Sequence, residues 1–363
     1  MMAISFKSSC SLSSCFISLF RRSYSIIDNP SLPVLAREVT SALKPKDGDV
    51  FLDMTFGSGG HTEYLLSSKK DVTVIAMDRD PAAIEKAFEM AKGYPVVPIL
   101  GKFSDSAKLM NKLGIRKGSL RGIIIDVGPS KLQEDDPKRG FTPFHEEDGP
   151  LDMRMDDGPV TAADVLNTLD TEYLAKLIKT YGEERNAKKV AQAVVDARFM
   201  MMSISSTKQF CQLLSSIIET SSIVKVFHAL RRFVNNELNE LDYAIEKMRP
   251  YLILDPNTPS NVQDKGFPLE QLDSGVMAVI ANQTLEDRIV KDHFSSSVAD
   301  GEMDPYSQKP INVLESPTTG DMNKVFKKNW IPLEKFVLFP QEDEVLANPR
   351  SKASKLRCAL RAR

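Results

Sequence analysis

Cysteine is scarce in this chain, and so is net charge of either sign. The 363 residues include four cysteines, at positions 10, 15, 211 and 358, with no CxxC pair and no cluster of histidine and cysteine. This pattern predicts no zinc site and no disulfide framework, so we interpret the thiols as reduced. A formal net charge of −2 argues against a generally cationic surface, and any polyanion must therefore meet a local basic patch. No apolar run approaches ~18 residues, so we expect no transmembrane helix.

Acidic residues are missing from residues 1–27, since the first carboxylate is Asp28. This segment is rich in serine and carries basic residues, and Arg22-Ser23-Tyr24-Ser25 resembles a processing site. The composition is typical of a mitochondrial presequence, which predicts import into the matrix. A secretory signal is the alternative, but its apolar core would be short, broken by serine and followed by the basic residues. A disordered tail is the remaining alternative.

The segment that follows alternates short apolar runs with helix-like stretches. With 42% hydrophobic residues the chain can bury a substantial core. The alternation predicts parallel βαβ units and a Rossmann-like, doubly wound α/β sheet. Its expected strands are VFLDM (50–54), VTVIAM (72–77), VVPIL (96–100) and GIIIDV (122–127), with VMAVIAN (276–282) as a later candidate.

Strand candidates are absent between 132 and 230, where every periodic segment has helical spacing. This predicts a helical insertion at 132–230 that divides an α/β domain into the parts 31–131 and 231–347. Residues 230–248 read as one long amphipathic helix, and 348–363 as a basic C-terminal tail without acidic residues. The segment 251–275 is too long for an ordinary turn.

The stretch DMTFGSGGH (53–61) places a glycine loop directly after the first expected strand. Glycines there allow backbone to approach a ligand, although a simple turn is an equally good reading. Asp78 ends the next strand, where a carboxylate can accept hydrogen bonds from ribose hydroxyls. The dinucleotide pattern GxGxxG fails at Thr62. We therefore predict a nucleoside cofactor, with S-adenosylmethionine (SAM) ahead of NAD.

Asp126 ends the fourth expected strand, in the run DVGPS (126–130). The carboxyl ends of parallel strands form the edge where open α/β sheets hold ligands. Asp126 is thus a candidate for the reacting centre, and a capping or turn carboxylate is the alternative.

Several motifs recur together and in one order along the chain. They are DMTFGSGGH (53–61), AMDRDP (76–81), GKFSD (101–105), DVGPSKLQ (126–133), RGF (139–141), DGPLDMRM (148–155), YGEER (181–185), ALRRFVNNEL (229–238), LEDRIVK (285–291) and NPRSKASKLR (348–357). Over residues 31–358 the chain resembles the cytosine-N4 methyltransferases of small-subunit ribosomal RNA, a family with bacterial and mitochondrial members. DGPLDMRM and YGEER are the motifs most specific to that family, and the presequence points to its mitochondrial branch.

The resemblance implies a SAM-dependent methyltransferase domain interrupted by a helical substrate domain, with small-subunit rRNA or an assembling subunit as the partner and no metal. By the resemblance, cofactor-binding positions are Gly59, Gly60, His61, Asp78, Phe103, Asp126 and Gln133. Asp126 is also the expected catalytic residue, because its carboxylate could hydrogen-bond the N4 amine of cytosine and align it with the methyl donor.

The two most specific motifs also have plain structural interpretations. Asp152 and Arg154 of DGPLDMRM could form only an ion pair, since the motif does not itself assign them a chemical role. The charged residues of YGEER could be a solvated cluster, or they could brace the helical domain against the active site.

The chain departs from the family at the segment before LEDR. It carries Ala281-Asn282-Gln283-Thr284 where the family has Ser-Phe-His-Ser. Losing the aromatic ring and the histidine removes a stacking surface and a group that handles protons. Two further functions therefore stay open: a SAM-binding ribosome-assembly factor without efficient methyl transfer, and an NAD-dependent oxidoreductase, which Thr62 disfavours.

Overall fold

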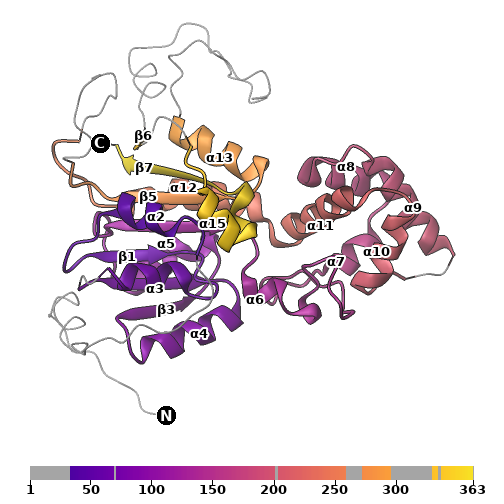
Figure 1. The fold of residues 1–363 in the computed structure, drawn as a ribbon, viewed down its shortest axis with the longest axis horizontal. Helices are drawn as coiled ribbons and strands as arrows, with labels where there is room; N and C mark the ends of the chain where they lie inside the picture. Colours follow the sequence, from indigo (N-terminus) through magenta and orange to yellow (C-terminus); the bar gives the residue numbers. More distant parts are fainter. Residues whose placement is uncertain are drawn as a thin grey trace, which may run out of the picture.

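A computed structural model describes residues 33–68, 71–200, 203–258, 272–295, 329–333 and 337–362. The expected presequence at 1–27 and residues 259–271 of the long segment 251–275 lie outside these ranges. Within them the chain forms two lobes, an α/β domain and a helical domain beside it (Figure 1).

The α/β domain contains a seven-stranded sheet in the order β3-β2-β1-β4-β5-β7-β6. The five strands from β3 to β5 in this order are parallel, and β7 runs antiparallel to both β5 and β6. The strands are β1 (Val50–Asp53), β2 (Thr73–Asp78), β3 (Val96–Leu100), β4 (Gly122–Val127), β5 (Val276–Ala281), β6 (Trp330–Pro332) and β7 (Lys355–Arg361). The predicted Rossmann-like α/β class is confirmed.

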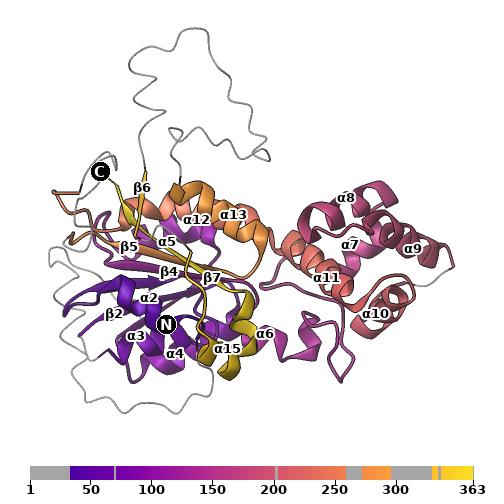
Figure 2. The same ribbon diagram turned by 45° about the horizontal axis from the view of Figure 1, so that its top comes forward.

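Helices cover both faces of this sheet and bury its near-continuous apolar strands (Figures 1 and 2). One face packs against α5 (Ser106–Lys112), α12 (Glu237–Met248) and α13 (Thr284–Ser295), and the other against α2 (Ala36–Leu43), α3 (Gly60–Leu66) and α4 (Pro81–Ala91). Parallel strands buried on both faces explain why their sequences are apolar runs rather than alternating patterns. The remaining short elements are η1 (Phe103–Asp105), α6 (Lys131–Glu134), η2 (Pro137–Arg139), η3 (Arg249–Tyr251), α15 (Glu342–Ala347) and η5 (Pro349–Ala353).

The expectation of a basic C-terminal tail at 348–363 is wrong, because its second half is strand β7 in the sheet interior. The basic side chains there are engaged within the protein. Arg357 Nε donates to Asp287 Oδ1 at 2.7 Å, and Arg361 Nη1 donates to the carbonyls of Pro250 and Leu252. The period-two alternation of KLRCALR, which buries Leu356, Cys358 and Leu360, was the signal for a strand.

The helical domain is built from α7 (Ala162–Thr168), α8 (Thr171–Gly182), α9 (Ala187–Phe199), α10 (Thr207–Ser215) and α11 (Thr220–Asn235). These helices enclose a hydrophobic core of their own, separate from the three clusters beside the sheet. The expected single helix at 230–248 is wrong. Asn236 has φ +53°, a left-handed conformation that asparagine tolerates, and it separates α11 in the helical domain from α12 against the sheet.

Two glycines bring the RGF and DGPLDMRM motifs into backbone contact. A Cβ atom on Gly149 would overlap the carbonyl of Pro137, and one on Gly140 would overlap the carbonyl of Pro150. Met153 N donates to the Arg139 carbonyl at 2.9 Å and fixes the same junction. These motifs therefore specify how the chain leaves the α/β domain for the helical one.

We expect Gly149→Ala to lower the free energy of unfolding by about 1–3 kcal/mol, because the added methyl must displace backbone rather than a flexible side chain. Gly93→Ala is the matched control, since a Cβ atom added at Gly93 would have nothing within 4 Å. Thermal unfolding of the full chain measures both. Equal melting temperatures for the two variants would contradict this account of the junction.

Candidate active site

Four neighbouring strands end at one edge of the sheet and bring the expected site residues together. In the order β3-β2-β1-β4, the strand ends lead to Phe103, Asp78, the glycine loop with His61, and Asp126. The chain runs from β1 outward to β3 and then returns to β4 on the other side of β1. This reversal is the topological switch point at which open α/β sheets bind ligands.

The glycines of the loop are required by the protein itself. Gly59 has φ +87°, and a Cβ there would meet the side chains of Phe56 and Met90. A Cβ on Gly60 would lie 3.2 Å from Pro33. Gly57 has φ +52° and donates its N–H to Asp78 Oδ2 at 2.7 Å. The loop conformation thus has structural reasons, and the assignment of Gly59 and Gly60 to a cofactor stays a prediction.

Asp78 holds the loops after β1 and β2 together through its carboxylate. Oδ2 accepts from Gly57 N, and Oδ1 accepts from Asp80 N at 2.9 Å. Each oxygen retains acceptor capacity beyond that bond. Burial, the dominant influence, raises the pKa of Asp78 to about 6, although the two N–H donors favour the ionised form.

Asp53 lies fully buried beneath the glycine loop. Its carboxylate accepts from the Thr62 hydroxyl at 2.8 Å and from Thr55 N at 3.1 Å. Burial raises the pKa of Asp53, while His61 and the Thr62 hydroxyl act in the opposite direction. Thr62, the residue that breaks the dinucleotide pattern, therefore has a structural partner of its own.

His61 and Asp126 face one another at the centre of this edge. His61 Nε2 lies 3.6 Å from Asp126 Oδ2, with side-chain exposures of 7% and 28%. The backbone N–H of Asp126 donates to the Thr55 hydroxyl at 2.7 Å, which ties the end of β4 to the loop after β1. A partly exposed carboxylate is thereby held beside a buried imidazole.

Phe103 and Gln133 lie in the segments that follow β3 and β4. Phe103 begins η1 and packs, partly buried, against the sheet core. Gln133 is buried, with Oε1 accepting from Ser130 N and Nε2 donating to Asp80 Oδ2 at 2.7 Å. Both ends of its amide thus bind protein groups, so Gln133 positions the loop after β4. Its contact with a cofactor stays a prediction.

The departure at 281–284 has a structural role at the end of β5. Asn282 Nδ2 donates to the Val127 carbonyl at 2.8 Å, and its Oδ1 accepts from the Ser354 hydroxyl. This side chain therefore connects the loop after Asp126 to the start of β7. Gln283 is half-buried beside it, and its N–H donates to Glu286 Oε2.

Glu286 of the LEDR motif is a fully buried carboxylate. Its Oε2 accepts from the N–H groups of Asn282 and Gln283, while Oε1 lies 3.1 Å from Arg232 Nη2 and 3.7 Å from Arg231 Nη2. Burial raises its pKa, and the two guanidinium groups oppose that rise. Both arginines belong to α11, so the ion pair joins the helical domain to the carboxyl edge.

The YGEER motif meets this cluster from the helical domain. Arg232 Nη1 donates to the Tyr181 carbonyl at 2.5 Å. Gly182 fits only without a side chain, because a Cβ would approach the Lys225 carbonyl at 2.6 Å. Glu184 is buried and accepts from Asn186 N. These contacts join α8, α9 and α11 within the helical domain, and the expectation that the charged residues of YGEER brace it against the active site stays a prediction.

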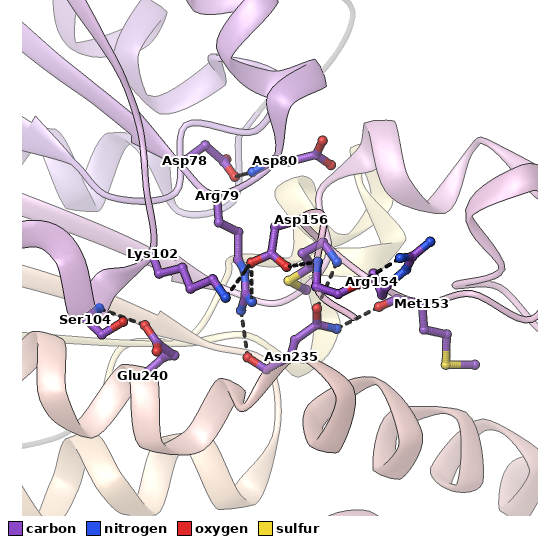
Figure 3. Close-up of polar contacts among 12 residues, drawn as sticks. Asp78, Arg79, Asp80, Lys102, Ser104, Met153, Arg154, Asp156, Asn235 and Glu240 are labelled. Carbon is purple, nitrogen blue, oxygen red and sulfur yellow. Dashed lines mark hydrogen bonds and ion pairs between the residues drawn. The ribbon is translucent and has the colours of Figure 1, made fainter. Parts of the chain in front are cut away.

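A second bridge crosses between the domains beside Asp78 (Figure 3). Arg79 donates through Nη2 to Asp156 Oδ2 at 2.6 Å and through Nη1 to the Asn235 carbonyl. Lys102 Nζ lies 3.2 Å from the same Asp156 oxygen. Asn235 in turn bonds both the Met153 carbonyl and Met155 N. The DGPLDMRM motif is thereby tied to the loops after β2 and β3.

Arg154 pairs with Asp152 two residues away, at 2.7 Å, which is the ion pair that the sequence allowed for this motif. Sequence reasoning gave no role to Arg79, Asp156 or Asn235. The only available signal was their position in or beside the motifs AMDRDP, DGPLDMRM and ALRRFVNNEL, because their partners lie far away in sequence.

Within the ranges that the structure covers, no group of three His, Cys, Asp or Glu residues could hold a metal ion. None of the helices placed there is long and apolar enough to cross a membrane.

Comparison with known proteins assigns the chain to a family. The profile of the MraW methylase family matches residues 29–257. A methyltransferase-like protein 15 homolog of Drosophila melanogaster is 36% identical, with 94% of this chain and 96% of that protein covered. The human protein named 12S rRNA N(4)-cytidine methyltransferase METTL15 is 35% identical, with 91% of this chain and 82% of that protein covered.

A protein of Culex quinquefasciatus named receptor-type tyrosine-protein phosphatase mosPTP-1 is 38% identical over 91% of this chain, but the chain spans only 22% of its length. The resemblance that the motifs indicated is confirmed by the family profile and by the two relatives matched over most of their length. The chain belongs to the MraW methylase family.

Proposed function

We propose that the protein is a SAM-dependent methyltransferase that adds a methyl group to the N4 amine of a cytidine in mitochondrial small-subunit rRNA. The observation that carries the proposal is the partly exposed Asp126 carboxylate at the switch point of the sheet, beside the glycine loop. Membership of the MraW methylase family and similarity to a 12S rRNA N(4)-cytidine methyltransferase support it.

The residues at the edge fit SAM. Asp78 retains acceptor capacity for ribose hydroxyls, and Phe103 in η1 after the neighbouring strand β3 offers an apolar side chain for an adenine ring. When bound, SAM supplies an electrophilic methyl group on a sulfonium sulfur.

Asp126 would hold the amine that receives the methyl group. The lone pair of the cytosine N4 is delocalised into the ring, which makes the amine a weak nucleophile. A carboxylate that accepts a hydrogen bond from N4 increases electron density on the nitrogen and orients it. Asp126 lies in β4 and its N–H donates to the Thr55 hydroxyl, so the carboxylate extends from a fixed backbone position.

The helical domain is the proposed substrate-binding part. A base in a folded rRNA must leave its stack to reach a reacting centre at the sheet edge. Exposed basic residues of α9, such as Lys188, can meet phosphates. Lys189 also donates to the Ile217 carbonyl, so its first role is within the domain. The composition of residues 1–27 supports location in the mitochondrial matrix.

The alternative function is a ribosome-assembly factor without efficient methyl transfer, and the observation that favours it is Asn282. Its amide is engaged by Val127 and Ser354, so it provides neither the stacking surface nor the titrating group of the family's Phe-His pair. The test below separates this alternative from the enzyme.

Asp126→Asn should reduce methyl transfer by about 10²–10⁴-fold, because the amide cannot accept a proton and is a weaker acceptor than the carboxylate. The measurement is mass spectrometry of N4-methylcytidine in small-subunit rRNA from cells lacking the protein, complemented with wild type or variant. Asp71→Asn is the control, since Asp71 is exposed just before β2, at the opposite edge of the sheet. An unchanged level of N4-methylcytidine in cells without the protein would reject the enzyme, and rescue by Asp126→Asn would reject the role of Asp126.

SAM binding should weaken as the pH falls below about 6, where Asp78 becomes protonated and loses acceptor capacity. A drop from pH 7 to pH 5 should lower affinity by up to about tenfold, since the carboxylate fraction falls by that factor one unit below the pKa. Calorimetric titration with SAM measures the affinity. Asp78→Asn should bind weakly at both pH values, whereas Asp71→Asn should keep the wild-type pH dependence. Equal wild-type affinity at pH 7 and pH 5 would contradict the role of Asp78.

A further inference from the structure

His61 has an unusual place among the buried polar groups of the edge. It lies in the first turn of α3, and its side chain is 7% exposed. Its Nε2 has no hydrogen-bond partner among the residues that the structure places. Leaving a buried polar nitrogen unpaired is energetically costly. Such an atom at a candidate site indicates a functional partner.

Asp126 is the group that faces this nitrogen. The distance of 3.6 Å from Nε2 to Asp126 Oδ2 is slightly longer than a hydrogen bond, so a small side-chain rotation brings the two atoms into contact. Asp53 is the second carboxyl group near the ring, from β1, and His61 lowers its pKa. Both oxygens of Asp53 already accept from Thr55 and Thr62. Among the described residues, Asp126 is the carboxylate with an oxygen within 4 Å of Nε2.

The proposed reaction leaves a proton to be removed. The bond between N4 and the methyl carbon forms while the carbon–sulfur bond breaks, and the electron pair of that bond stays on sulfur. The methylated amine then carries an extra proton and a positive charge until it loses that proton. Asp126 is the more exposed member of the pair and can take the proton from N4 directly.

We propose that His61 stores this proton behind Asp126. The carboxylate accepts the proton from N4 and passes it to Nε2, which regenerates the carboxylate. After product release the proton returns through Asp126 to water. This role rests on the proposed function and goes beyond a cofactor contact. Because His61 acts through Asp126 and does not touch the amine, it is a positioning residue rather than a catalytic one.

The first test needs no turnover. The full chain is prepared with 15N-labelled histidine, and the His61 signal is identified by its loss in His61→Gln. Replacing Asp126 with Asn should shift the Nε2 resonance at pH 7.5, because the ring loses its facing carboxylate. Asp71→Asn should leave it unchanged. An Nε2 resonance that is the same in wild type and Asp126→Asn overturns the proposal, whatever the activity of the protein.

The second test measures methyl transfer to small-subunit rRNA. His61→Gln should lower kcat by about 10²-fold, because glutamine cannot accept a proton. The KM for SAM and for RNA should stay within about threefold of wild type, and the melting temperature should be unchanged. A loss confined to the KM for SAM would make His61 a cofactor contact and overturn the relay.

The two proposals fail in different ways. An active wild type together with a wild-type kcat in His61→Gln rejects the proton store and leaves the methyltransferase standing. Wild type that transfers no methyl group to small-subunit rRNA rejects the proposed function, and the relay with it.

Discussion

The buried carboxylate of Glu286 is the interaction on which the arrangement of the two domains depends. It is fully buried, and its cost of desolvation is offset by two arginines of α11 and two backbone N–H groups of the β5–α13 loop. Removing one member of such a cluster typically costs about 3–5 kcal/mol, because the others remain as buried charges. The helical domain and the β5–α13 loop are thus held together by the same buried carboxylate.

A second consequence concerns the motifs themselves. RGF, DGPLDMRM, YGEER and ALRRFVNNEL act mainly at the junction between the domains, through close backbone contacts and through the bridge from Arg79 to Asp156 and Asn235. Their contacts fix the position of the helical domain beside the α/β domain. The residues expected to meet the cofactor and the base are few by comparison, and they come from separate strands.

The loop after β1 shows how far local reasoning reaches. Its glycines were recognisable, and so was its position at a strand end. Their immediate neighbours, Phe56, Met90 and Pro33, were not, because those contacts form only when α4 and the chain before α2 pack against the loop. Asn282 is similar. The departure from the family pattern was visible, whereas its bonds to Val127 and Ser354 join segments that are distant in sequence.

The α/β class, the family and the strand ends at which Asp78 and Asp126 lie could be predicted from the sequence, since hydrophobic periodicity and ordered motifs are local properties. Tertiary structure decided that the basic C-terminal segment is a strand inside the sheet, that α11 and α12 separate at Asn236, and that His61 faces Asp126. The reason is physical. Strand pairing, domain junctions and the meeting of side chains from different strands depend on long-range packing, and no single stretch of sequence contains both partners.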